Sequence, residues 1–122
     1  MESVTYRYVG RAEYGAVWEM QKRLFDELLE AKKAGIGAGQ TLLMVEHPHV
    51  YTLGKSGHES NMLVSDEFLR SIGASYFHTD RGGDITYHGY GQLVGYPILD
   101  LERLGLSLKE YVWTVEECVI RT

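Results

Sequence analysis

The stretch from Asp80 to Asp100 constrains the fold most, because it carries two strand patterns separated by a glycine-bearing link. It reads DRGGDITYHGYGQLVGYPILD. Ile85 and Tyr87 alternate with polar neighbours, which is the pattern of a half-buried strand. A second apolar run follows at residues 93–99. The stretch therefore predicts a strand, a turn and a second strand.

The flanks of the first predicted strand carry residues suited to a small-molecule site. Gly82 and Gly83 allow positive φ and let a ligand approach bare backbone N–H groups. Arg81 adds a fixed charge with a planar array of donors. His88 ends the strand with a side chain whose ordinary pKa lies near neutrality. Turn glycines and a structural histidine explain the same residues, and on chemistry alone that alternative stays open.

Length and composition limit the class of protein. The 122 residues predict one domain, residues 1–122, with a modest core. A net charge of −5 gives no support to nucleic-acid binding. No apolar run is long enough to span a membrane, and the N-terminus lacks the pattern of a secretory signal. The single cysteine excludes an internal disulfide framework. We therefore expect a cytoplasmic protein.

The hydrophobic patterns predict a mixed α/β fold. Strands are expected at 5–9, 41–46, 50–53, 75–79, 85–88 and 93–99, and helices at 12–34, at 66–71 and from 108 onward. Ser65 and Ser107 are the expected N-caps of the last two helices, and Glu110 completes a capping box. We expect the last five of these strands to form one central sheet with the three helices packed against it.

His47 and His49 would point the same way along an extended chain, which is the geometry of a His-x-His metal pair. No third ligand at suggestive spacing accompanies them. We therefore expect structural histidines and no metal site.

Three segments resemble one enzyme family. Residues 81–101, RGGDITYHGYGQLVGYPILDL, closely resemble the signature of the lipoyl(octanoyl) transferases. Residues 43–54, LMVEHPHVYTLG, resemble the family's VEHPPVYTLG segment, and Asn61-Met62-Leu63 resembles the short piece that follows it. One departure is Tyr90, which stands where the family usually has proline in His-Gly-Pro-Gly. Tyrosine leaves φ unfixed and restores an N–H, so a looser or differently shaped turn is expected there.

The resemblance implies a fold and an activity. The fold would be similar to the biotin/lipoate ligase and octanoyltransferase catalytic domain, truncated at its C-terminal side. The activity would be an octanoyltransferase step of lipoate biosynthesis and protein lipoylation. An octanoyl group would move from octanoyl-acyl carrier protein, through a cysteine thioester, to a lysine of lipoyl domains. Those domains belong to the 2-oxoacid dehydrogenases and the glycine cleavage H protein.

The resemblance also implies which residues take part. The acyl-substrate wall would be Arg81, Gly82, Gly83, Asp84, Ile85, Thr86, Tyr87 and His88, with no cofactor and no metal. Members of the family continue beyond the position of Thr122, and their catalytic cysteine and lysine lie there. We therefore expect an N-terminal portion that is inactive alone. Cys118 lies on the apolar stripe of the last predicted helix and is expected to pack in the core. Lys55 is not expected to be the catalytic lysine.

Two other functions stay open. A relative of the lipoate or biotin ligases would activate a free acid with ATP, but their versions of the Arg81-Gly82-Gly83 segment are arginine-rich or carry three glycines. A non-catalytic module that binds acyl groups or lipoyl domains would use the same wall without chemistry.

Overall fold

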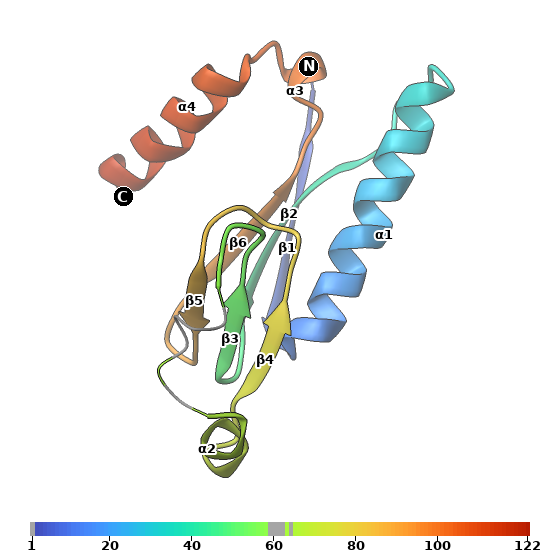
Figure 1. The fold of residues 1–122 in the computed structure, drawn as a ribbon. Helices are drawn as coiled ribbons and strands as arrows, with labels where there is room; N and C mark the ends of the chain where they lie inside the picture. The colour runs from blue at the N-terminus through green and yellow to red at the C-terminus, as the bar shows by residue number, and fades with distance from the viewer. Residues whose placement is uncertain (1, 59–62, 64) are drawn as a thin grey trace. The chain divides into compact units, whose positions relative to one another are not determined.

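The structure is a computed structural model that describes residues 2–58, 63 and 65–122. In chain order its elements are β1 (Val4–Arg11), α1 (Tyr14–Lys33), β2 (Gln40–Glu46), β3 (Val50–Leu53), α2 (Asp66–Ser71), β4 (Ser75–His78), β5 (Ile85–His88), β6 (Val94–Ile98), α3 (Leu101–Leu104) and α4 (Leu108–Arg121) (Figure 1). The predicted mixed α/β class is confirmed. Asn61 and Met62 of the third matching segment lie outside the described residues.

The strands form two sheets, so the prediction of one central sheet is wrong. The strand orders are β1-β2-β6 and β4-β3-β5. The break falls between β2 and β3 at Pro48, which has no N–H to donate to a ladder. As a result β5 and β6 belong to different sheets, and the link between them does not close a hairpin.

The second sheet is organised around β3. This strand pairs in parallel with β4, with Val50 opposite Ser75, and antiparallel with β5, with Val50 opposite His88. Side chains of a strand alternate between the two faces of a sheet. Thr52 therefore shares one face with His88, whereas Tyr87 lies on the opposite face.

The described chain divides into two compact units, each with buried residues of its own. One consists of Met1–Arg7, Gln21–Leu43 and Tyr96–Thr122, and its buried side chains are Leu28, Gln40, Leu43, Ile98 and Asp100. The other consists of Tyr8–Met20 and Met44–Gly95, and its buried side chains are Tyr14, Val17, Val45, His47, Val50, Thr52, Leu53, Leu69 and Thr79.

Two helices, α2 and α4, begin where the sequence predicts, whereas α1 begins at Tyr14, two residues after its predicted start. Ser65 caps α2 by accepting from the Phe68 N–H, and Ser107 forms a capping box with Glu110 at the start of α4. The short helix α3 was not predicted, because a single turn carries too few residues for a periodic pattern. Among the described residues, no helix has the length and apolar character that crossing a bilayer requires.

The apolar stripe of α4 is not a core face in this structure. No residue of α4 is buried, and Val119 and Ile120 are 72% and 77% exposed. Cys118 is exposed as well, so the prediction that it packs in the core is wrong. A helical pattern predicts which residues share a face, but burial of that face depends on what packs against it.

Candidate functional site

A loop, Arg81–Asp84, lies against the end of β3 in close backbone contact. The Gly54 N–H donates to the Asp84 carbonyl at 3.0 Å, and the Lys55 N–H donates to the Arg81 carbonyl at 2.9 Å. A Cβ atom at position 54 would collide with the carbonyl oxygens of Gly82 and Gly83. The fit of this loop on β3 therefore requires glycine at position 54.

The Arg81 side chain braces this loop from within. Its Nη2 donates to the carbonyl oxygens of Thr52 and Asp84, both at 2.7 Å, and its Nη1 donates to the Gly82 carbonyl at 2.6 Å. Its Nε donates to Thr52 Oγ1 at 3.2 Å. The guanidinium donors that the sequence suggested for a ligand are thus directed at the protein.

The glycines leave the outer side of the loop open. Gly83 has φ +88°, a backbone conformation that favours glycine. A Cβ atom on Gly82 would meet nothing within 4 Å, and Gly82, Gly83 and Asp84 are all exposed. The backbone of the loop is therefore exposed at Gly82, and a role of this loop in ligand binding stays a prediction.

The four remaining predicted site residues alternate along β5 between the two faces of its sheet. Ile85 and Tyr87 share the face of Tyr51, and the rings of Tyr87 and Tyr51 lie 5.0 Å apart. The Tyr87 ring also stacks on His49 at 5.9 Å, and its hydroxyl hydrogen-bonds to His49 Nδ1. This face thus carries an aromatic surface, in which Tyr87 is 37% exposed.

His88 and Thr86 lie on the opposite face, where His88 approaches His47. The two imidazole centroids are 6.1 Å apart, and His47 Nδ1 lies 2.8 Å from the Ala12 carbonyl. Burial lowers the pKa of His88, a hydrogen bond with the Gln92 side chain opposes this shift, and the nearby His47 and Arg81 charges lower the pKa further. The lowered pKa therefore favours the neutral imidazole form of His88.

Tyr14 of α1 covers the His47 ring on this side. The two ring centroids are 5.2 Å apart, and the Phe77 ring lies 5.1 Å from Tyr14. Burial raises the pKa of the Tyr14 hydroxyl, with a smaller opposing effect of the Arg81 charge. Tyr14, His47 and Phe77 therefore form an aromatic cluster next to His88, at the end of β5.

The predicted residues divide into three environments. The loop brings Arg81 to Asp84 together, while β5 sends its side chains to two opposite faces. Sequence reasoning did not assign Thr52 or Gly54 to the site, although both lie in the matching 43–54 segment. The signal for Gly54 was a glycine directly after a strand, which often marks a close backbone approach.

The two histidines of the His-x-His pattern have different partners. His47 lies beside the Ala12 carbonyl, and His49 contacts the Tyr87 hydroxyl. Across the described residues, no group of three or more possible metal ligands is found.

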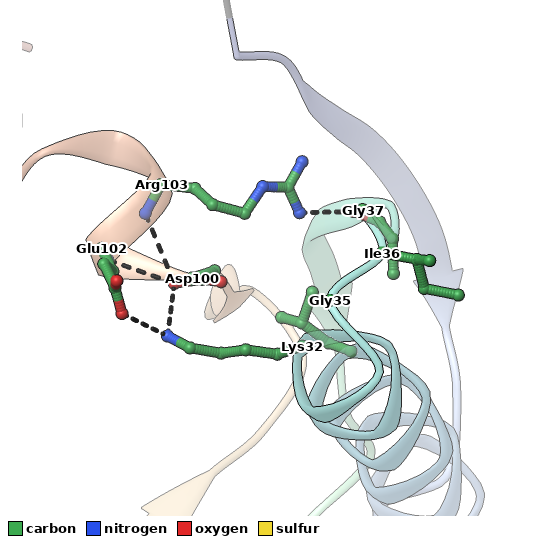
Figure 2. A pocket seen from close by; sticks show the side chains of 9 residues that line it. Lys32, Gly35, Ile36, Gly37, Asp100, Glu102 and Arg103 are labelled. Atoms are coloured by element: carbon green, nitrogen blue, oxygen red, sulfur yellow. Dashed lines mark hydrogen bonds and ion pairs between the residues drawn. The ribbon is translucent and has the colours of Figure 1, made fainter.

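A cavity of about 390 Å³ lies in the other unit, between the end of α1 and α3 (Figure 2). The Lys32 Nζ lies 3.0 Å from Asp100 Oδ1 and 3.1 Å from Glu102 Oε2, and the Arg103 Nη1 donates to the Ala38 carbonyl at 2.7 Å. The hydrogen bond from Lys32 lowers the pKa of the Asp100 carboxyl. The Lys32 ammonium thus pairs with both carboxylates, and none of the predicted site residues lines the cavity.

Comparisons with known proteins assign the chain to a family. The family model of the lipoyl protein ligase A/B catalytic domain matches residues 13–122. A relative from Bacteroides fragilis named octanoyltransferase is 57% identical over 108 residues, which are 88% of this chain and 49% of the relative. An octanoyltransferase of Parabacteroides distasonis is 48% identical over 121 residues, 99% of this chain and 55% of the relative. The chain spans about half the length of these curated relatives, and it belongs to the lipoyl protein ligase A/B catalytic domain family.

Proposed function

We propose that the complete protein to which this chain belongs is an octanoyltransferase. It moves an octanoyl group from octanoyl-acyl carrier protein to a lysine of lipoyl domains, in the 2-oxoacid dehydrogenases and the glycine cleavage H protein. The observation that carries the proposal is the 57% identity to a protein named octanoyltransferase, over 88% of this chain. The 81–101 segment, which resembles the family signature, lies within residues 13–122 that match the family model.

In this proposal, residues 81–88 form the wall against which the octanoyl chain lies. The open backbone at Gly82 lets the acyl group approach closely, because a Cβ atom there would meet nothing within 4 Å. Ile85 and Tyr87 offer apolar and aromatic surface on one face of β5. Burying the chain stabilises the complex by about 0.8 kcal/mol per methylene, so the wall contributes several kcal/mol.

Arg81 serves this wall by fixing the shape of the loop. Its guanidinium holds the carbonyl oxygens of Thr52, Gly82 and Asp84. Pre-organised backbone loses little freedom when a ligand binds, which favours affinity. Arg81 therefore acts as a positioning residue, and the substrate meets the loop that it braces.

The reaction proceeds in two acyl transfers. A cysteine thiolate attacks the thioester carbonyl of the donor, the C–S bond to the carrier breaks, and the carrier thiolate leaves. The amine of the target lysine then attacks the new thioester, forms the amide after losing a proton, and releases the enzyme thiolate. Each tetrahedral intermediate requires donors aimed at its oxyanion.

We place the nucleophilic cysteine and the assisting lysine outside this chain. The chain spans about half of the relatives' length, and its one thiol, Cys118, lies exposed on the apolar stripe of α4. This chain alone is then inactive, and neither a cofactor nor a metal ion takes part in the transfer.

Mass spectrometry after incubation with octanoyl-acyl carrier protein tests the proposal. We expect a covalent octanoyl adduct on the complete protein and on its Cys118→Ser variant, but none on residues 1–122 alone. An adduct on Cys118 of this chain would instead make it a self-sufficient acyl acceptor. If the complete protein acquires octanoate only with ATP and the free acid, it is a ligase. If it binds octanoyl groups without any covalent step, it is a binding module.

A further inference from the structure

The turn that follows β5 takes its conformation from two features. The Gln92 N–H donates to the Gly89 carbonyl at 3.1 Å, and Gly91 has φ +91°. In a type II turn, the N–H of the fourth residue donates to the carbonyl of the first residue, and the third residue has a positive φ. Proline is favoured at the second position of such turns because it fixes φ. Tyr90 occupies this position without that restraint.

Contacts from the ends of β1 and β2 hold this turn in place. The Gly91 N–H donates to Glu46 Oε2 at 3.0 Å. The Arg11 Nε lies 3.9 Å from the same carboxylate oxygen, and the Arg11 guanidinium carbon lies 4.5 Å from the centroid of the Tyr90 ring. A guanidinium over an aromatic face is attracted by the ring quadrupole. We call Arg11, Glu46 and Tyr90 the Arg11 clamp.

The clamped turn leads directly to His88. Gln92, the last residue of the turn, hydrogen-bonds through its side chain with His88. His47 also lies close to His88, with their ring centroids 6.1 Å apart. His47 directly follows Glu46, and its Nδ1 lies 2.8 Å from the carbonyl of Ala12, the residue after Arg11. The same two strand ends therefore hold both the turn and the ring that faces His88.

We propose that the Arg11 clamp positions His88 and the adjoining end of the acyl-substrate wall, replacing with side-chain contacts the rigidity that a proline would supply at position 90. The inference rests on the proposed octanoyl transfer for its catalytic consequence. Arg11 and Glu46 contact the turn and Tyr90 is part of it, and all three are positioning residues.

Substitutions at Tyr90 in the complete protein test this role through kcat/KM for octanoyl transfer. Tyr90→Ala removes the ring and leaves φ free, so kcat/KM falls about tenfold, in keeping with the sensitivity of transfer to misplacement. Tyr90→Phe keeps the ring, and Tyr90→Pro fixes φ without it, so both stay within about twofold of wild type. Tyr6→Ala removes a comparably exposed tyrosine from β1 and leaves kcat/KM unchanged.

Combining substitutions at Arg11 and Tyr90 distinguishes positioning of the turn from general stabilisation of the protein. Arg11→Ala lowers kcat/KM in the wild-type background but has little further effect in the Tyr90→Pro background, because the turn no longer depends on the ring contact. The inference is overturned if Tyr90→Pro is as impaired as Tyr90→Ala. It is also overturned if Arg11→Ala leaves wild-type kcat/KM unchanged.

Amide hydrogen exchange at Gly91 checks the clamp without any substrate. We expect a protected Gly91 N–H in the wild type, a loss of protection in Glu46→Ala, and retained protection in Glu46→Gln, which keeps an acceptor oxygen. An unprotected wild-type Gly91 overturns the clamp itself. If protection responds as expected but the wild-type protein transfers no octanoyl group, the proposed function fails and the clamp stands.

Discussion

The Arg81–Asp84 loop and the helix α4 show opposite relations between regular structure and packing. The loop has no helix or strand, yet backbone and side-chain hydrogen bonds join it to Thr52, Gly54 and Lys55. Helix α4 is regular and has a capping box, yet none of its residues is buried. The contrast shows that local sequence signals are enough to start a helix, whereas the shape of an irregular loop depends on distant partners.

The largest effect on stability is expected from a side chain placed where the loop packs against the end of β3. Gly54→Ala places a Cβ against the carbonyl oxygens of Gly82 and Gly83, and we expect it to lower the free energy of unfolding by about 2–3 kcal/mol. Gly82→Ala is the matched control, because a Cβ there meets nothing within 4 Å, and it should change stability by less than about 0.5 kcal/mol. Urea denaturation measures both. Equal effects of the two substitutions would contradict the close approach.

Removing the Arg81 hydrogen bonds should lower the free energy of unfolding somewhat less than Gly54→Ala does. Arg81→Met keeps an unbranched side chain but loses every donor to Thr52, Gly82 and Asp84. We expect a loss of about 2 kcal/mol in the free energy of unfolding, since hydrogen bonds to charged groups are strong but this side chain is partly exposed. Arg23→Met on the exposed side of α1 serves as the control in the same urea titration. A loss no larger than that of the control would show that the guanidinium does not brace the loop.

On the α4 side, the expected effect is smaller and local. Ser107→Ala removes the side-chain acceptor for the Glu110 N–H and should destabilise the start of the helix by about 1 kcal/mol. Because α4 buries no residue, the loss should appear as faster amide exchange in its first turn, with little change in the midpoint of global unfolding. Ser107→Asp restores an acceptor and should restore protection. A large fall in the global midpoint would mean that α4 is packed after all.

The smallest effect concerns the pH dependence at His88. Burial holds the folded-state pKa of His88 below its ordinary value, so the unfolded chain binds the proton first as the pH falls. The stabilisation is complete above about pH 6.5 and is lost as the pH falls from there through the lowered folded-state pKa. We expect His88→Gln to flatten the dependence of unfolding free energy on pH in this window. An unchanged slope in His88→Gln would show that His88 is not the cause of this pH dependence.

The sequence predicted those features that depend on neighbouring residues. Ser65 and Ser107 located the starts of two helices, and Pro48 marked the interruption between β2 and β3. Such signals act within one turn of helix or one strand, so they are readable without knowledge of the rest of the chain. The resemblance of residues 81–101 likewise gave the family, which the comparison over residues 13–122 confirms.

Features that depend on contacts between distant parts of the chain could not be predicted from the sequence. The division into two sheets follows from which strands pair, and β5 pairs with β3, more than thirty residues earlier in the sequence. Whether Cys118 is buried depends on what covers α4, and its periodicity alone gave the wrong answer. The direction of the Arg81 guanidinium toward Thr52 depends on the register of β3 against the loop. Contacts with distant parts of the chain, or their absence, therefore decided each of these outcomes.

The central place of β3 in its sheet has a consequence for synthesis of the chain. Both partners of β3 come later in the sequence, since Val50 pairs with Ser75 and with His88. At a translation rate of about 5–20 residues per second, the ribosome needs on the order of 1–5 s to reach the first residue of β4 after making β3. During that interval Val50 and Leu53, which end with 1% of their surface exposed, have neither neighbouring strand. Until β4 follows, the nascent chain therefore carries an apolar strand that lacks both of its partners.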